Sequence, residues 1–260
     1  MKVVILCGGR GTRLREETEI RPKPLVEIGN RPIIWHIMKI YAQYGFKDFI
    51  LCLGYKGEMI KEYFLNYEAM NNDFSIKLGS HDTIQFHSGH LEKDWNVTLV
   101  NTGNEAQTGA RIKRIEKHID GDIFMVTYGD GVGNIDIGKL LEHHRTCKKI
   151  GTVTGVHPPS RFGEVMIKGN NITEFNEKPQ VKEGFINGGF FVLNRKFFTY
   201  LKEEDNCYLE REPLEKLSKE KQLSVYLHEG FWQCMDTQRE LDILNELWKN
   251  KKAPWKVWKD

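Results

Sequence analysis

Short apolar runs alternate with longer stretches of helical periodicity along much of the chain. Residues 3–7, 49–53 and 123–127 are nearly continuous apolar runs, typical of strands that are covered on both faces. Stretches 33–45, 58–67 and 109–119 instead repeat apolar residues at helical spacing, and the first of them follows Pro32 and ends at Gly45. The alternation predicts an α/β fold with a mainly parallel sheet flanked by helices.

Two parts of the chain change this pattern. Between about residues 70 and 100, short alternating segments at 75–78 and 83–87 predict a β-rich insertion. From residue 151 onward, strand patterns return at 152–156, 164–167 and 189–193, and helices are expected at 195–202 and 237–249. With no internal repeat and no linker, the sequence predicts one domain over residues 1–260, with halves at about 1–135 and 136–260.

Composition narrows the class of protein. The chain has 260 residues, 40% hydrophobic and 28% charged, and a formal net charge of +2, which does not favour a nucleic-acid partner. Its five cysteines are widely spaced without a C-x-x-C pair, as expected of reduced thiols in the cytosol. No apolar stretch approaches the roughly 18 residues that a membrane span needs. We expect a cytoplasmic protein without a membrane partner.

The first candidate for chemistry is the run Leu6-Cys7-Gly8-Gly9-Arg10-Gly11-Thr12-Arg13 after the first strand. Glycines let backbone N–H groups approach an anion, and Arg10, Arg13 and the proline-flanked Lys23 add positive charge. The run lacks the lysine of a P-loop and the third glycine of a dinucleotide fingerprint. It therefore predicts a polyphosphate site of another kind.

Two aspartates are candidate magnesium ligands, because Mg²⁺ takes few carboxylates together with phosphate oxygens and water. Asp130 lies between two glycines directly after the strand at 123–127, where ligands of open α/β sheets bind, although Gly-Asp-Gly is also a common turn. Asp236 precedes the helix expected at 237–249, so the sequence alone allows either a metal ligand or a helix N-cap.

The glycine-rich run and Arg21-Pro22-Lys23-Pro24-Leu25 resemble the signature of the sugar-1-phosphate nucleotidylyltransferases. Within that family the chain resembles the cytidylyltransferases that act on glucose 1-phosphate. The resemblance spans nearly the full length and includes Tyr55-Lys56-Gly57, Trp95-Asn96-Val97-Thr98-Leu99-Val100, Thr127-Tyr128-Gly129-Asp130-Gly131 and Ala253-Pro254-Trp255-Lys256.

The resemblance implies a nucleotide-diphospho-sugar transferase fold, with a nucleotide-binding first half and a sugar-binding second half. It implies transfer of CMP from CTP to α-D-glucose 1-phosphate, giving CDP-glucose and pyrophosphate, with Mg²⁺ as cofactor. A homo-oligomer, specifically a hexamer, and a role in supplying CDP-linked deoxysugars to surface polysaccharide are also implied. The alternatives keep the chemistry with UTP or dTTP, or retain only the fold in a non-catalytic sugar-nucleotide sensor.

The resemblance also assigns residues. Asp130 and Asp236 match the metal ligands, and they act in catalysis with Arg13, Lys23 and Lys178. The sugar phosphate is matched to Tyr128, Glu177, Lys178, Asn187 and Gly188. The nucleotide is matched to Leu6, Cys7, Gly8, Gly9, Arg10, Gly11, Thr12, Arg13, Lys23, Ala106, Thr108, Gly109, Arg111 and Gly129. Arg111 and nearby backbone carbonyls would tell cytosine from uracil.

Overall fold

The central feature is a mixed seven-stranded sheet with the order β14-β10-β13-β8-β1-β4-β7. The computed structural model describes residues 1–79, 84–158, 164–168, 171–176 and 184–259, without the side chains of 164–176. The strands are β1 (Lys2–Leu6), β4 (Asp48–Leu53), β7 (Asn96–Asn101), β8 (Ile123–Tyr128), β10 (Gly151–Val156), β13 (Ile186–Asn194) and β14 (Leu223–His228). Only β13 runs antiparallel to its neighbours in this sheet, which confirms the predicted mainly parallel sheet.

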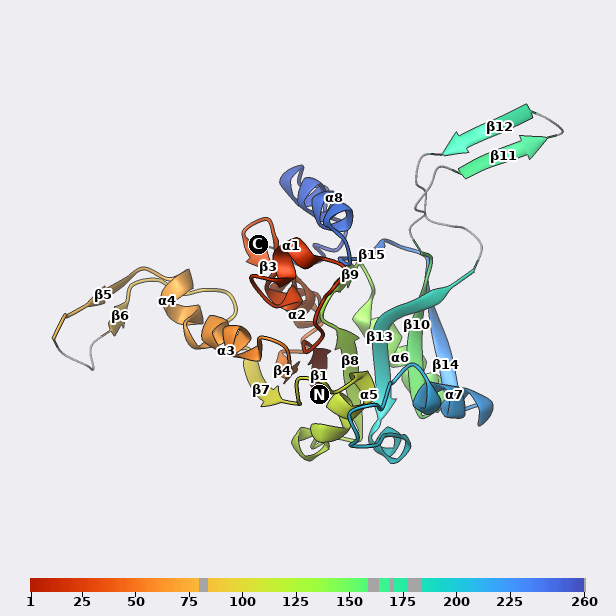
Figure 1. Ribbon diagram of the computed structural model, residues 1–260, viewed down its shortest axis with the longest axis horizontal. Helices are drawn as coiled ribbons and strands as arrows, with labels where there is room; N and C mark the ends of the chain where they lie inside the picture. Colours follow the sequence, from red (N-terminus) through yellow and green to blue (C-terminus); the bar gives the residue numbers. More distant parts are fainter. Residues whose placement is uncertain (80–83, 159–163, 169–170, 177–183, 260) are drawn as a thin grey trace.

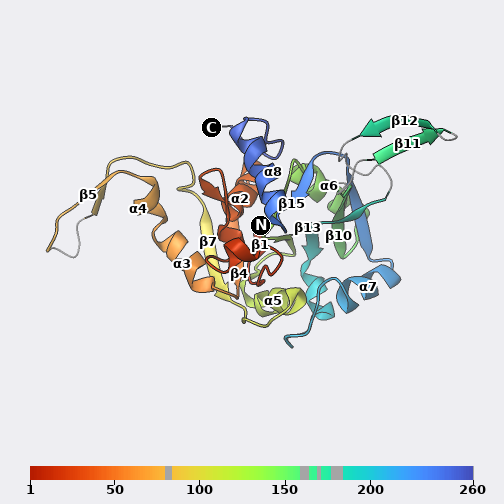
Figure 2. The same cartoon turned by 45° about the horizontal axis from the view of Figure 1, so that its top comes forward.

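Alternate residues of β1 enter two separate cores, which is why its sequence is continuously apolar. Val3 and Ile5 pack in the core beneath α2 (Ile33–Gln43), α6 (Ile137–Cys147) and α8 (Gln238–Lys249). Val4 packs in the core beneath α5 (Thr108–Arg114). Figure 2 shows α2 and α8 on one side of the sheet and α5 and α7 (Glu212–Lys219) on the other. The fold is therefore three-layered, with helices on both faces of the sheet.

Smaller elements complete the chain. The short helices are α1 (Arg15–Thr18), α3 (Gly57–Leu65), α4 (Tyr67–Asn71) and the 3₁₀ segments η1 (Lys23–Leu25), η2 (Glu116–His118) and η3 (Arg195–Tyr200). Two-stranded pairs form from β2 (Glu27–Ile28) with β3 (Arg31–Pro32), and from β9 (Gly131–Gly133) with β15 (Trp232–Cys234). The hairpins β5 (Phe74–Ile76) with β6 (Ile84–Phe86) and β11 (Glu164–Lys168) with β12 (Asn171–Asn176) project from the body in Figure 1.

The structure refines several predicted elements. The β-rich insertion is confirmed as the β5–β6 hairpin, but β7 at its end belongs to the central sheet. The helix expected at 109–119 ends as α5 at Arg114 and continues as the 3₁₀ segment η2, and the one expected at 195–202 is also 3₁₀. Helix α7 and the edge strand β14 had no counterpart in the prediction. Within the described ranges, no helix has the length and apolar character to cross a membrane.

Candidate active site

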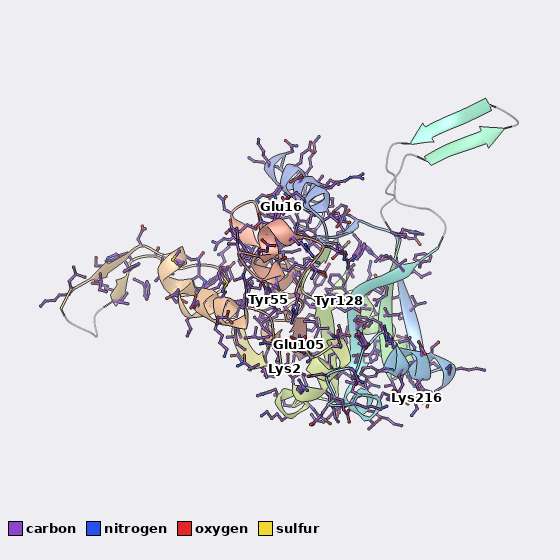
Figure 3. The ribbon with its side chains drawn as sticks, viewed as in Figure 1. Lys2, Glu16, Tyr55, Glu105, Tyr128 and Lys216 are labelled. Atoms are coloured by element: carbon purple, nitrogen blue, oxygen red, sulfur yellow. The ribbon has the colours of Figure 1, made fainter. Side chains whose placement is uncertain are left out.

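A cleft of about 1000 Å³ opens at the carboxyl ends of β1 and β8. Tyr128, the last residue of β8, is labelled near the middle of the molecule in Figure 3. Such an edge is where open α/β sheets bind ligands. Most of the predicted site residues line the cleft: Leu6, Cys7, Gly8, Gly9, Gly11, Thr12, Arg13, Lys23, Ala106, Thr108, Arg111, Tyr128, Gly129, Asp130, Asn187 and Asp236.

The side chain of Arg111 supports the backbone of the glycine-rich run. This side chain belongs to α5, is only 4% exposed, and donates to the carbonyl oxygens of Gly8 (3.0 Å) and Leu53 (3.0 Å). It also donates to the Thr102 hydroxyl and to the Gly103 and Asn104 carbonyls, at 2.9, 2.7 and 3.4 Å. A Cβ on Gly8 would lie 2.1 Å from the Arg111 guanidinium carbon, so the close packing requires glycine there. Both terminal guanidinium nitrogens are thus engaged by backbone carbonyls, and one of these carbonyls, that of Gly8, belongs to the glycine-rich run.

A cation between two carboxylates forms the polar centre of the cleft. The Lys23 ammonium lies 2.7 Å from Oδ2 of Asp130 and 2.5 Å from Oδ1 of Asp236. Arg13 contacts the other oxygen of Asp236 at 2.9 Å. Lys23 is 8% exposed and belongs to η1, where flanking prolines restrict the backbone. The Asp130 and Asp236 carboxylates raise the pKa of Lys23 despite the opposing effect of burial, so the ammonium stays charged.

The pair β9–β15 brings the two aspartates together. Asp130 follows β8 and precedes β9, and its carbonyl accepts from the backbone N–H of Met235 at 2.8 Å. Asp236 does not cap α8: Thr237 is the N-cap, and Glu240 completes a capping box with it. The Glu240 carboxylate also accepts from the backbone N–H of Asp236, at 2.7 Å. The Asp236 side chain lines the cleft, and the helix-cap role that the sequence allowed for it is excluded.

The donor set fits a hard divalent cation. Asp130 and Asp236 supply oxygens that already converge on one positive charge, that of Lys23, and Mg²⁺ accepts two carboxylates when phosphate oxygens and water complete its shell. Among the described residues there is no cluster of three or more His, Cys, Asp or Glu side chains that could hold a metal by itself. These carboxylates would therefore hold a metal jointly with a phosphate ligand.

A hydrogen-bonded wall of Thr108, Tyr128, Asn187 and Glu210 also lines the cleft. The Tyr128 hydroxyl donates to Glu210 at 2.5 Å and accepts from the Asn187 amide at 3.2 Å. The Thr108 hydroxyl donates to the second oxygen of Glu210 at 2.7 Å and accepts from the backbone N–H of Leu209 at 2.9 Å. Burial, followed by the charge of Glu210, raises the pKa of Tyr128, so its hydroxyl remains protonated at neutral pH.

Some predicted residues occupy other places. Arg10 pairs with Glu105 among exposed side chains, and the Gly109 N–H donates to the carbonyl of Cys207 at 2.9 Å. The Gly188 carbonyl accepts from the indole N–H of Trp232 at 2.8 Å. None of these three predicted residues is among those that line the cleft. Glu177 and Lys178 lie outside the described residues.

Sequence reasoning missed Glu210 and Glu240 as cleft residues. For Glu240 a signal existed, because Thr237 followed three residues later by glutamate is a capping-box pattern. For Glu210 the surrounding Tyr208-Leu209-Glu210-Arg211 carries no recognisable motif. Its place in the cleft arises only because the chain before α7 crosses in front of Thr108 and Tyr128.

Comparison with known proteins agrees with this geometry. A family model described as nucleotidyl transferase matches residues 2–260. Relatives named glucose-1-phosphate cytidylyltransferase, from Salmonella typhimurium and Salmonella typhi, are 46% identical over 259 residues, which is 99% of this chain and 100% of theirs. A crystal structure of UDP-glucose pyrophosphorylase complexed with UDP-glucose has a TM-score of 0.69 at 16% identity and covers 96% of this chain and 98% of that one.

The last likeness concerns the fold, which is that of the nucleotide-diphospho-sugar transferases. The family model and the relatives together cover the whole chain apart from single terminal residues. The chain therefore belongs to the nucleotidyl transferase family.

Proposed function

We propose that this protein transfers CMP from CTP to α-D-glucose 1-phosphate, giving CDP-glucose and pyrophosphate. The observation that carries the proposal is the cluster of Lys23, Asp130 and Asp236 at the strand ends, in a cleft that also contains Arg13. Such a cluster suits a reaction in which two highly charged anions must meet. The cytidylyltransferases that share 46% of its residues over their full length support CTP and glucose 1-phosphate as substrates.

In the proposed reaction an oxygen of the sugar phosphate attacks the α-phosphorus of CTP. A new P–O bond forms while the bond from the α-phosphorus to the bridging oxygen breaks, and that oxygen leaves with pyrophosphate. Positioning and charge neutralisation account for catalysis of this kind, without a nucleophilic side chain. Arg13 and Lys23 would hold the triphosphate and stabilise the charge on the leaving pyrophosphate, and the glycine-rich run would admit it to close backbone contact.

Asp130 and Asp236 would hold the proposed Mg²⁺, which when bound supplies positive charge to the phosphate oxygens. Lys23 now lies between these carboxylates, and we infer that its ammonium moves to the phosphates when the substrates and the metal enter. The two aspartates thus serve one cation before binding and another afterwards.

Base and sugar recognition are assigned to different residues of the cleft. We propose that cytosine binds near Ala106, Thr108 and the backbone that follows β1, and that Arg111 positions this backbone. The sugar phosphate is proposed to bind beside Tyr128 and Asn187. The resemblance adds Glu177 and Lys178 to this proposal. The first half of the chain would then bind nucleotide and the second half sugar. A homo-hexamer is part of the same proposal, and multi-angle light scattering tests it.

The direct test is pyrophosphate release with glucose 1-phosphate and each of CTP, UTP, dTTP, ATP and GTP, with and without Mg²⁺. We expect turnover with CTP that requires the metal. Equal rates with UTP would contradict the choice of base. Nucleotide binding without turnover would instead identify a non-catalytic sensor.

Asp236→Asn tests the metal-binding role with little change of shape. We expect turnover to fall at least about 100-fold, because loss of a group that organises transition-state charge typically has an effect of this size. Asp242→Asn is the matched control, since Asp242 lies nearby in the sequence, on α8, but contacts Gln238 at the exposed surface. Wild-type turnover in Asp236→Asn would remove Asp236 from the mechanism.

A further inference from the structure

We propose that Glu210 determines sugar specificity: its carboxylate accepts hydrogen bonds from hydroxyl groups of the hexose 1-phosphate. The inference rests on the proposed function, because it concerns the sugar side of the same cleft. Glu210 follows Leu209, which is fully buried, and lies just before α7, so its backbone is anchored while its side chain reaches the cleft.

The hydrogen bonds of Glu210 leave acceptor capacity free. One oxygen accepts from Tyr128 at 2.5 Å and the other from Thr108 at 2.7 Å. An ionised carboxylate has about four lone-pair positions and no proton to donate. About two positions therefore remain for ligand groups that donate hydrogen bonds.

The surrounding network fixes the direction of these bonds. Tyr128 accepts from Asn187, whose amide oxygen accepts from the backbone N–H of Gly189 at 2.8 Å. Thr108 accepts from the backbone N–H of Leu209. Both hydroxyls consequently direct their only protons to Glu210. The wall therefore favours hydroxyl donors and disfavours a ligand that offers only acceptors at this place.

Charge and sheet order point to the hexose. The negative charge of Glu210 repels phosphate oxygens. The charge of Lys23 does not offset this repulsion, because Lys23 pairs with Asp130 and Asp236. The glycine-rich run follows β1, while Tyr128 ends β8 and Asn187 belongs to β13, which lies on the side of β8 away from β1. Through Tyr128 and Asn187 the contacts of Glu210 extend away from the phosphate loop, whereas its contact with Thr108 reaches the side proposed for cytosine. Hydroxyls of the second substrate are the ligand groups that suit this end of the cleft.

The experiment compares Glu210→Gln and Glu210→Ala with the wild type by measuring KM for glucose 1-phosphate and for CTP. We expect KM for the sugar phosphate to rise about 10- to 100-fold, as befits loss of hydrogen bonds to a charged group, while KM for CTP changes less than about twofold. Glu212→Gln is the matched control, because Glu212 is an exposed glutamate two residues away that pairs with Lys202. Its constants should equal those of the wild type.

Deoxy analogues separate a direct contact from a structural role. For the wild type, at least one of the 2-, 3-, 4- and 6-deoxyglucose 1-phosphates should have a higher KM than glucose 1-phosphate. For Glu210→Gln, the KM of that analogue should equal the KM of glucose 1-phosphate. Three results would overturn the inference. They are an equal rise in KM for every analogue, an unchanged KM for glucose 1-phosphate, and a rise in KM for CTP alone. If the wild type makes no CDP-glucose, the proposed function fails. Calorimetric binding of the same sugar phosphates then decides the role of Glu210 separately.

Discussion

The role of Arg111 yields the sharpest prediction, because the resemblance assigns it to cytosine recognition whereas the structure shows it holding loop backbone. Arg111→Ala removes hydrogen bonds to five oxygen atoms. At about 1 kcal/mol net for each bond, the loss amounts to about 5 kcal/mol. The carbonyls of Leu53 and Gly8 retain backbone donors, Thr102 and Tyr55 respectively, which lowers the expected loss to about 3 kcal/mol.

A loss of that size is a large part of the 5–15 kcal/mol that typically stabilises a domain. We would measure it by urea unfolding at neutral pH, following the fluorescence of the six tryptophans. The matched control is Arg145→Ala on the exposed surface of α6, for which we expect less than about 0.5 kcal/mol.

The alternative is that the guanidinium itself reads cytosine. In that case Arg111→Ala would change the ratio of CTP to UTP turnover and leave the free energy of unfolding nearly unchanged. The structure predicts the opposite, a large loss of stability and an equal rise of KM for both nucleotides, because the loop that holds them has moved. A stability loss below about 1 kcal/mol together with relaxed base choice would refute our reasoning.

Three further predictions concern single residues. Gly8→Ala places a Cβ against the Arg111 guanidinium and should lower the free energy of unfolding by at least about 2 kcal/mol. At Gly9 a Cβ faces open space, so Gly9→Ala should be nearly neutral. Equal free energies of unfolding for the two variants would contradict this expectation. Without nucleotide, Lys23→Met should bind Mn²⁺ about tenfold more tightly than the wild type, because no ammonium competes for the carboxylates. Paramagnetic resonance titrations measure this affinity, and weaker binding would disprove the competition. Burial lowers the pKa of His36 from 6.5 to about 4, so the unfolded chain binds its proton more readily and stability should fall by up to about 3 kcal/mol as pH drops through this window. Urea unfolding of wild type and His36→Gln across pH 4–7 checks this, and identical slopes would refute it.

The strands that carry the site were predictable because their signal is local. A run such as residues 123–127 is apolar at every position except Thr127, since both faces of β8 are covered, and this can be read without knowing what covers them. The backbone constraints at the glycines before Arg13 and at the prolines around Lys23 can likewise be inferred from the residue types alone. The 3₁₀ geometry of η3 was harder to predict, because its sequence does not separate a 3₁₀ segment from a short α-helix. The edge strand β14 was missed although Leu223, Val225 and Leu227 alternate with more polar residues.

The sequence by itself determined the fold class, the positions of the first strands along the chain and the candidate residues for phosphate and metal binding. Only the tertiary structure decided which of them meet. The pairing of β9 with β15 places Met235 opposite Asp130 and so brings Asp236 close to it, and Thr237 rather than Asp236 caps α8. Arg111 turned inward to the loop backbone, and Glu210 entered the cleft without any motif. Periodicity and turn chemistry act over a few neighbouring residues, whereas these contacts join distant segments whose approach depends on how the whole sheet packs.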